Sequence, residues 1–418
     1  MRPNLSIIEL QYSVTGDSMK NKINKANDYV INNKQNILDA LFSLLAIQSI
    51  SSDTKFKSEI QKAAEWIKSY LQKIGIKNTK ILPTGQNPVV FGENLSAGPN
   101  KPTILIYGHY DVQPPDPMEL WNSAPFSPNI KDGLLFARGA SDMKGQLMVA
   151  LSAIQAINAT SQIPVNLKFF IEGEEEIGSP SVEEFLLKHK ELFSSDFVLN
   201  LDAGMLSKDQ PTIVYGLRGL AYFEIYIEGP KHDLHSGLFG GVVYNPILAL
   251  SKILAGMVDE KGVIQLPGFY NDVLPLSQSE RDKIKKLGLE DDYYIHQTGA
   301  KALFGEAGFS PTERIGARPT LDVNGIIGGY TGEGPKTVIP SKAMAKLSTR
   351  LVPNQTPDKI RWQLENYMKT HAPSQIKWEI KQISSDPACI TNPNSPETQC
   401  FADSLEEVWG TEPLYLRE

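Results

Sequence analysis

The sequence predicts an α/β protein with a mostly parallel central sheet, followed by a second domain in which strands and helices mix. Three short apolar segments near residues 103, 166 and 197 carry the first prediction, because strands buried in a parallel sheet are almost continuously apolar. Helical patterns lie before and between these segments. From Gly216 onward, strand-like alternation and helical spacing are interleaved, which favours a separate α+β domain.

Composition places the chain among globular proteins and argues against nucleic-acid partners. At 418 residues, it is long enough for two domains with their own cores. Hydrophobic residues make up 41% and charged residues 21% of the chain, which is ordinary for such proteins. The net charge of -7 provides no basic surface for nucleic acid.

The N-terminal residues and the cysteines predict the compartment. Residues 1–18 lack a basic region followed by an apolar core, so they are interpreted as a loose leader rather than a signal peptide. No apolar run reaches the roughly 18 residues that a membrane helix needs. The cysteines, Cys389 and Cys400, have neither a disulfide pattern nor metal-finger spacing. We therefore expect a cytoplasmic protein without a membrane partner.

Two helices are predicted before the central strand. Residues 36 to 48 have helical spacing, and the clearer helix spans about residues 56 to 74. Its apolar residues recur three and four positions apart, which places them on one face of a helix. These residues are Ile60, Ala63, Ala64, Ile67, Leu71 and Ile74.

The central strand is predicted over residues 103 to 107 and is followed directly by polar side chains. His109 and Asp111 come just after it, where open α/β sheets usually place ligands. Such a pair alone is more typical of a solvated loop. Five prolines between residues 114 and 128 then predict a long irregular segment, and segments of this kind are often functional.

Acidic residues follow the later elements as well. Asp142 precedes a helix predicted from Gln146 to about Asn158, and an isolated Asp there is usually an N-cap. The strand over residues 166 to 171 runs into the acidic segment Glu172-Gly-Glu-Glu-Glu176, and the strand over 197 to 201 ends at Asp202. A solvated acidic loop is the simple interpretation. A bound cation is the alternative, because it makes crowded carboxylates favourable.

Together these side chains predict a metal centre. The carboxyl ends of parallel strands lie at one edge of a sheet, so the histidine and the carboxylates can converge there. A mixed imidazole and carboxylate set suits zinc or manganese better than a metal that prefers thiolates. A carboxylate able to bridge two cations indicates a hydrolytic centre with two metals.

At these residues the sequence resembles a family of dinuclear-zinc hydrolases. The family includes carnosine dipeptidases, bacterial dipeptidases, acetylornithine deacetylase, succinyl-diaminopimelate desuccinylase and glutamate-releasing carboxypeptidases. The resemblance runs from about residue 40 to the end of the chain. The matching segments are Gly108-His-Tyr-Asp-Val-Gln-Pro114, Arg138-Gly-Ala-Ser-Asp-Met-Lys-Gly145, Glu172-Gly-Glu-Glu-Glu-Ile-Gly-Ser179, Asp202, Asp233-Leu-His-Ser-Gly237 and Lys336-Thr-Val-Ile-Pro340.

The resemblance implies a role for each metal-site residue. Asp142 bridges two divalent ions, His109 and Asp202 bind one of them, and Glu176 binds the other. The ions are expected to be zinc, with manganese or cobalt as alternatives. Asp111 would hold the tautomer of His109, as the partners of metal-bound imidazoles usually do.

The resemblance also implies the reaction. Glu175 is the expected general base, which takes a proton from a metal-bridging water that attacks an amide bond. Family members that cleave dipeptides tend to carry Asp where this chain has Asp202, whereas the deacylases and carboxypeptidases tend to carry Glu. This favours a dipeptidase. The alternatives are an N-acyl-amino-acid deacylase or desuccinylase, and a non-catalytic, homodimeric metal-binding fragment.

The resemblance divides the chain into a zinc-peptidase catalytic domain and an inserted lid. The catalytic domain is expected over residues 19–215, with an incomplete return over 385–418. Residues 216–384 would form an α+β, ferredoxin-like lid through which the chain dimerises, with a variable insert near 265 to 315. Family members carry a further metal-binding His near the C-terminus. No His follows His371 here, so the resemblance implies a chain that stops before this ligand.

Three lid residues are candidates for substrate contacts. A lone His235 is more typical of a structural or exposed residue, but the matching His of the family stabilises the oxyanion, often in the partner's active site. Arg350 can be an ordinary ion-pair partner, whereas the resemblance implies a clamp on the substrate carboxylate. Asn324 can shape a turn, and the resemblance implies a polar contact with the substrate.

Overall fold

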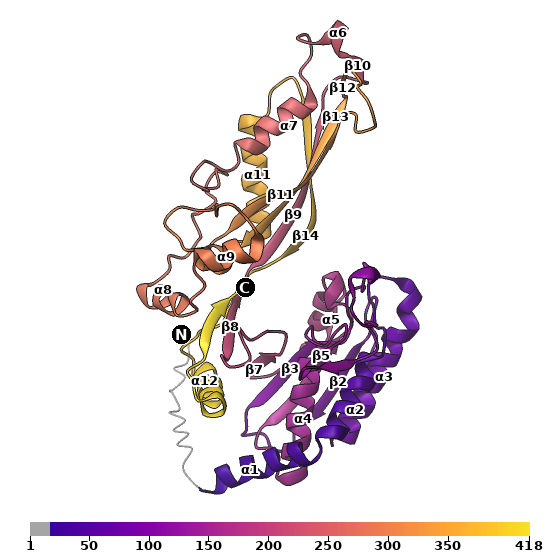
Figure 1. The fold of residues 1–418 in the computed structure, drawn as a ribbon, viewed down its shortest axis with the longest axis vertical. Coiled ribbons are helices and arrows are strands. Elements are labelled where there is room, and N and C mark those ends of the chain that lie inside the picture. Colours follow the sequence, from indigo (N-terminus) through magenta and orange to yellow (C-terminus); the bar gives the residue numbers. More distant parts are fainter. Residues whose placement is uncertain (1–16) are drawn as a thin grey trace, which may run out of the picture. The chain divides into compact units, whose positions relative to one another are not determined.

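The computed structural model describes residues 17–418, with side chains from residue 21 onward. The predicted loose leader, residues 1–18, therefore lies outside the described residues except at its end, where helix α1 (Asp17–Asn32) begins. The chain forms two compact units, Met1–Gly204 and Met205–Glu418 (Figure 1). The boundaries expected for a catalytic domain and a lid remain a prediction.

Unit 1 is built on a five-stranded sheet. Its strands are β1 (Asn78–Leu82), β2 (Val89–Asn94), β3 (Thr103–His109), β6 (Asn166–Glu172) and β7 (Phe197–Asn200), in the order β1-β2-β6-β3-β7. The prediction of parallel strands is confirmed for the three that end at the site, since β3 runs parallel to both β6 and β7. β2 runs antiparallel to β1 and to β6. The sheet as a whole is therefore mixed.

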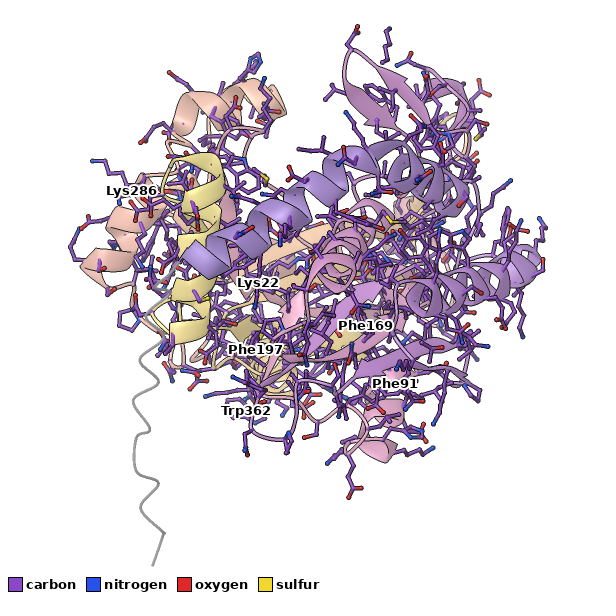
Figure 2. All side chains as sticks on the ribbon, turned by 90° about the horizontal axis from the view of Figure 1, so that it is seen from below. Lys22, Phe91, Phe169, Phe197, Lys286 and Trp362 are labelled. Atoms are coloured by element: carbon purple, nitrogen blue, oxygen red, sulfur yellow. The ribbon has the colours of Figure 1, made fainter. Side chains whose placement is uncertain are left out.

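Helices cover both faces of this sheet. The predicted helices correspond to α2 (Lys34–Leu45), α3 (Lys57–Lys73) and α4 (Lys144–Thr160), and these pack on the face that carries Ile106 and Phe169. The opposite face carries Phe91 and packs on α5 (Val182–Lys188). Figure 2 labels Phe91 and Phe169, one from each of the two cores. With both faces covered, every residue of β6 is buried.

The long proline-rich segment contains only short elements. It holds a single 3-10 turn, Met118–Leu120, and a two-stranded hairpin of β4 (Asn129–Lys131) and β5 (Leu134–Phe136). A second 3-10 turn, Thr54–Phe56, precedes α3, and a third, Glu175–Ile177, follows β6. This third turn carries the predicted general base.

Unit 2 contains the predicted α+β domain. Its four-stranded antiparallel sheet has the order β11-β13-β9-β14. Along the chain the order is β9 (Gly219–Glu228), α7 (Pro246–Ala255), β11 (Thr320–Gly328), β13 (Lys342–Leu351), α11 (Pro357–His371) and β14 (Lys377–Asp386). This succession of strand, helix, two strands, helix and strand is that of ferredoxin-like domains. The predicted lid fold is thus present, with α7 and α11 packed on one face of the sheet.

The remaining elements of unit 2 form three small groups. The short strands β10 (Leu234–His235) and β12 (Val338–Ile339) pair with each other, next to α6 (Ser236–Phe239). The predicted insert contains α8 (Gln278–Lys285), α9 (Asp291–Thr298) and α10 (Pro311–Gly316). β8 (Thr212–Leu217) lies between β15 (Cys389–Ile390) and β16 (Leu414–Arg417) in a third sheet, beside α12 (Pro396–Trp409). Among the described residues, every helix is too short or too polar to cross a bilayer.

Candidate metal centre

Three of the four predicted ligands, His109, Asp142 and Asp202, converge at one imidazole nitrogen. His109 is the last residue of β3 and is fully buried, and its Nε2 lies 3.1 Å from Oδ1 of Asp142. The same Nε2 lies 3.6 Å from Oδ2 of Asp202 and 3.8 Å from Oε2 of Glu175. Asp202 comes two residues after β7 and Glu175 three residues after β6. The shared edge of three parallel strands thus brings together residues that are far apart in the chain.

The geometry of this cluster fits a cation. His109, Asp142 and Asp202 each offer one ligand atom, and these atoms lie within 4.8 Å of one another. Imidazole nitrogen and carboxylate oxygen are suitable ligands for zinc, and this spacing allows one ion to contact all three. Several carboxylates facing one another repel without a positive charge among them. A divalent ion at this position would remove that repulsion.

Asp142 does not cap the helix that follows it. The N-cap position of α4 is Met143, and in the described chain no side chain accepts a hydrogen bond there. The Asp142 carboxylate instead faces His109. The hydrogen bond between these two side chains is the largest cause of the lowered pKa of Asp142. The peptide bond between Asp142 and Met143 is cis. The N-cap interpretation of Asp142 is therefore wrong.

The four glutamates at and just after the end of β6 divide into two structural and two candidate functional residues. Glu172 is buried and accepts hydrogen bonds from Tyr107 and Ser179, each at 2.8 Å. The structure holds Glu174 in the same way, fully buried with three donors: the Thr84 hydroxyl at 2.6 Å, the Asn87 N–H at 2.9 Å and the Ser181 N–H at 3.0 Å.

The other two glutamates of the segment, Glu175 and Glu176, are only partly buried, and Glu175 lies at the cluster. Glu175 is near His109, and the Glu176 carboxylate is close enough to Asp142 for the two charges to repel. The interpretation of the whole segment as a solvated acidic loop therefore does not describe this structure.

Asp111 supports the far side of the imidazole. Nδ1 of His109 lies 3.1 Å from the Asp111 carbonyl oxygen and 3.4 Å from its Oδ1. Oδ2 of Asp111 accepts a hydrogen bond from the Glu176 N–H at 3.1 Å. One buried carboxylate thus contacts both His109 and the backbone of Glu176, which is the arrangement expected for a residue that orients a metal-binding histidine.

The carboxylates around His109 make a positive charge favourable within the cluster. Burial lowers the pKa of His109, but its interactions with the carboxylates of Asp111, Asp142 and Asp202 outweigh burial and raise this pKa to about 12. Burial, together with the nearby carboxylates, raises the pKa of Glu175 to about 7. A histidine must be neutral to bind a metal, so a cation in the cluster would take the place of the proton on His109.

The segment that carries the cluster is fixed by buried contacts. Oγ of Ser49 donates to the Tyr110 carbonyl at 2.6 Å, and the Val112 N–H donates to the Ser49 carbonyl at 3.0 Å. The fully buried Lys144 donates from Nζ to the carbonyls of Leu44, at 3.2 Å, and Ile47, at 2.7 Å. Gln113 and Lys144 both lie in segments that match the family, but the sequence alone indicates no role for either side chain.

The three lid candidates lie in unit 2. His235 ends β10, is exposed, and accepts a hydrogen bond on Nδ1 from the Gly237 N–H at 3.0 Å. This leaves the hydrogen of a neutral ring on Nε2, as a donor for an oxyanion would require. Asn324 lies at a bulge of β11, not in a turn, because the pairing of β11 with β13 shifts between Val323 and Gly325. Bulges redirect side chains.

Arg350 has a second guanidinium as a neighbour. It lies exposed on β13, opposite Leu220 of β9. Burial and the nearby Arg350 lower the pKa of Arg218 to about 10, while Asp322 opposes this shift. Nε of Arg218 is buried and makes no hydrogen bond to the described residues. Two guanidinium groups near one carboxylate produce a net positive surface suited to an anion.

Comparisons with known proteins agree with the geometry. Residues 105–417 match the model of peptidase family M20/M25/M40. The Beta-Ala-His dipeptidase of Homo sapiens is 31% identical over 95% of this chain and 82% of its own length. The Cys-Gly metallodipeptidase DUG1 of Saccharomyces cerevisiae is 30% identical over 92% of this chain and 84% of its own.

A solved structure gives the same result. The M20 family metallo-carboxypeptidase Sso-CP2 from Sulfolobus solfataricus superposes with a TM-score of 0.80 at 36% identity. The match covers 91% of this chain and 85% of the carboxypeptidase. The likeness therefore extends over both units and is not confined to the cluster around His109.

Proposed function

Because the chain belongs to peptidase family M20/M25/M40, a family of metal-dependent hydrolases, we propose that it cleaves the amide bond of dipeptides. The observation that carries the proposal is the cluster of His109, Asp142 and Asp202 around a position suited to a cation. The dipeptidases among its relatives support the substrate class.

We propose that the cluster holds two divalent cations. His109 and Asp202 would bind one, Glu176 the other, and Asp142 both. The support is the distance of 3.1 Å between Nε2 of His109 and Asp142, together with the closeness of Asp142 to Glu176. Zinc is the expected ion, with manganese or cobalt as alternatives, since all three accept nitrogen and oxygen ligands.

Glu175 is the proposed general base. Bound cations would lower the pKa of a water molecule and polarise the scissile carbonyl. Oε2 of Glu175 lies 3.8 Å from Nε2 of His109, so its carboxylate faces the place where that water would sit. Glu175 would accept the water proton and later deliver it to the amine nitrogen of the leaving amino acid. Burial raises the pKa of the Glu175 carboxyl to about 7, and nearby cations would lower this pKa, so that the ionised carboxylate can accept a proton near neutral pH.

The lid would bind the substrate. Arg350 is the proposed clamp on the terminal carboxylate of the dipeptide, and the nearby Arg218 makes that surface more positive. His235 would donate from Nε2 to the oxyanion, in its own or in a partner's active site. Asn324 would make a polar contact with the substrate, for which the bulge in β11 supplies a reason.

We propose that the chain forms a homodimer through unit 2. β11 is an edge strand of the four-stranded sheet, and Ile326 and Ile327 on it are more than half exposed. Leu238 and Val242 near α6 are also exposed. An open edge with apolar side chains is suited to pairing with another chain. The molar mass of the protein in solution tests this, and a monomer at all concentrations would contradict it.

A carboxypeptidase or a deacylase of the same family is the second candidate. The specific observation in its favour is the 36% identity with the metallo-carboxypeptidase Sso-CP2. A carboxypeptidase would cleave longer peptides from the C-terminus, and a deacylase would cleave N-acyl or N-succinyl amino acids. The presence of Asp202, rather than Glu, is the reason for preferring dipeptides.

We also propose that the protein works in the cytoplasm. Cys389 and Cys400 are both free and exposed. Exposed thiols persist in a reducing compartment and become oxidised elsewhere. Fractionation of the cells that make the protein tests this, and recovery outside the cytoplasm would contradict it.

Cation content and dipeptide turnover test the proposed function together. The purified chain is dialysed against dilute zinc, its cations per chain are measured by elemental mass spectrometry, and it is then screened with dipeptides, acylated amino acids and longer peptides. Two cations and turnover of dipeptides are the expected result. Cation binding without turnover of any substrate would instead support a non-catalytic metal-binding protein.

A further inference from the structure

Gln113 directs all its described side-chain hydrogen bonds to one proposed metal ligand. Its Nε2 donates to Oε2 of Glu176 at 2.8 Å and to the Glu176 carbonyl oxygen at 2.9 Å. Its backbone N–H approaches Oε1 of the same carboxylate at 3.2 Å. Both carboxylate oxygens of Glu176 therefore have a donor from Gln113.

The position of Gln113 is itself fixed. It follows Val112, which is buried and bonded through its N–H to the Ser49 carbonyl at 3.0 Å. Asp111, on the other side of Val112, accepts the Glu176 N–H at 3.1 Å. Asp111 and Gln113 thus hold Glu176 at its two ends, one at the backbone and the other at the carboxylate.

This arrangement is more than local packing. Gln113 is exposed, so its side chain adds little to the core. Glu176 lies in a single 3-10 turn, Glu175–Ile177, which has too few backbone bonds to fix a long side chain. An amide can direct a carboxylate without adding charge, whereas a carboxylate in its place would repel Glu176.

We propose that Gln113 is a positioning residue that holds the Glu176 carboxylate toward the cluster and thereby sets the affinity of the cation bound by Glu176. The inference rests on the proposed function, because Glu176 is a ligand only in that proposal. Partners of metal ligands generally change affinity by roughly 10- to 100-fold when they are removed. The cation held by His109 and Asp202 should be affected much less.

The main test variant is Gln113→Met, which keeps the shape of the side chain but removes its donors. Glu176→Ala identifies the cation that depends on Glu176. Gln61→Ala is the matched control, because Gln61 is another exposed glutamine whose amide bonds a glutamate, Glu65, at 3.3 Å. Dissociation constants for zinc are measured by competition with a chromophoric chelator. Cobalt-loaded samples report the coordination by visible absorption, and thermal unfolding of the cation-free proteins reports stability.

The inference predicts a selective loss. Gln113→Met should weaken the cation that Glu176→Ala removes by roughly 10- to 100-fold, and should change the cobalt spectrum. The other cation and the unfolding temperature of the cation-free protein should match those of the wild type and of Gln61→Ala. Wild-type binding of both cations by Gln113→Met would overturn the inference, and so would an equal weakening of both accompanied by lower stability.

The same set of proteins separates failure of the inference from failure of the proposed function. If Glu176→Ala loses a cation and Gln113→Met does not, only the role of Gln113 is wrong. If Glu176→Ala binds both cations like the wild type, or if the wild type binds none, the proposed metal centre is wrong, and the role of Gln113 falls with it.

Discussion

At the scale of single residues, the cluster separates glutamates that look alike in sequence. Glu172 and Glu174 are buried and hydrogen-bonded, whereas Glu175 lies at the cluster and Glu176 is close enough to Asp142 for their charges to repel. The assignment of Glu175 and Glu176 came from a family pattern. The sequence alone could not distinguish the four carboxylates, because two of the three donors to Glu174 come from Thr84 and Asn87, about ninety residues earlier.

Replacing Glu175 should remove the chemistry and keep the cations. Glu175→Gln cannot accept a proton, so kcat for dipeptides should fall by roughly 100- to 10,000-fold. Cation content should stay at the wild-type value, because Glu175 is not a proposed ligand. Steady-state kinetics and elemental analysis of the same sample check both statements, with Glu183→Gln on the exposed surface of α5 as the control. A wild-type kcat in Glu175→Gln would contradict the role of Glu175 as general base.

Replacing Arg350 should weaken substrate binding. Hydrogen bonds to a charged group contribute about 1.5–3 kcal/mol, so Arg350→Ala should raise KM by roughly 10- to 100-fold, with a smaller change in kcat. Arg361→Ala, on the exposed side of α11, serves as the control. An unchanged KM for dipeptides would mean that the carboxylate is bound elsewhere.

At the scale of secondary structure, the apolar pattern of the sequence predicts the helices and strands. Their arrangement depends on contacts between residues that are far apart in the chain. The apolar stripe from Ile60 to Ile74 predicted α3, and the three apolar segments predicted β3, β6 and β7. The antiparallel direction of β2 against β6 was not predicted. The residues of β2 and β6 do not indicate which strand each will pair with. The relative direction of the two strands depends on which edge of the sheet is free when they pair.

A single substitution where α2 meets α4 should lower the stability of the protein. Nζ of Lys144 at the start of α4 donates to the carbonyl of Leu44, in the last turn of α2, and to that of Ile47, two residues beyond the helix. Lys144→Met would remove the ammonium donor from both carbonyls, which would keep only the N–H groups of Ile47 and Ser49 as donors. Each lost hydrogen bond should cost about 0.5–1.5 kcal/mol in the free energy of unfolding.

Urea unfolding measures this cost. The exposed Lys62 of α3 offers a control, since Lys62→Met removes a similar side chain from the surface. If both variants unfold at the same urea concentration as the wild type, the contacts of Lys144 contribute nothing to stability. The sequence could not reveal this role, because the partners of Lys144 are 97 and 100 residues away.

At the scale of the whole molecule, the metal chemistry and the substrate contacts are assigned to different units. All proposed ligands lie in unit 1, whereas His235, Arg350 and Asn324 lie in unit 2. The family resemblance predicted both parts, including the ferredoxin-like order of the lid. The resemblance did not predict the helices of the insert, α8 to α10, because none of the matching segments includes them.

Removing cations should therefore destabilise one unit selectively. A cation at 100 times its dissociation constant stabilises the folded state that binds it by about 2.7 kcal/mol. Chelation should speed hydrogen exchange in β3, β6 and β7 and leave the core strands β9 and β13 of unit 2 unchanged. Mass spectrometry of exchanged peptides, with and without chelator, checks this. Equal acceleration in both units would contradict a metal centre confined to unit 1.

The pairing of β8 has a consequence for how the protein is made on the ribosome. All strands of the unit 1 sheet emerge by residue 200, so that sheet can close while later residues are still being translated. β8 emerges next, but its partners β15 and β16 begin only at Cys389 and Leu414. At a translation rate of about 5–20 residues per second, the apolar β8 should remain without its partner strands for roughly 10–40 seconds. We expect ribosome-bound chains stalled before Cys389 to be cleaved by protease at β8 and protected in unit 1, and protection of β8 at that stage would contradict this.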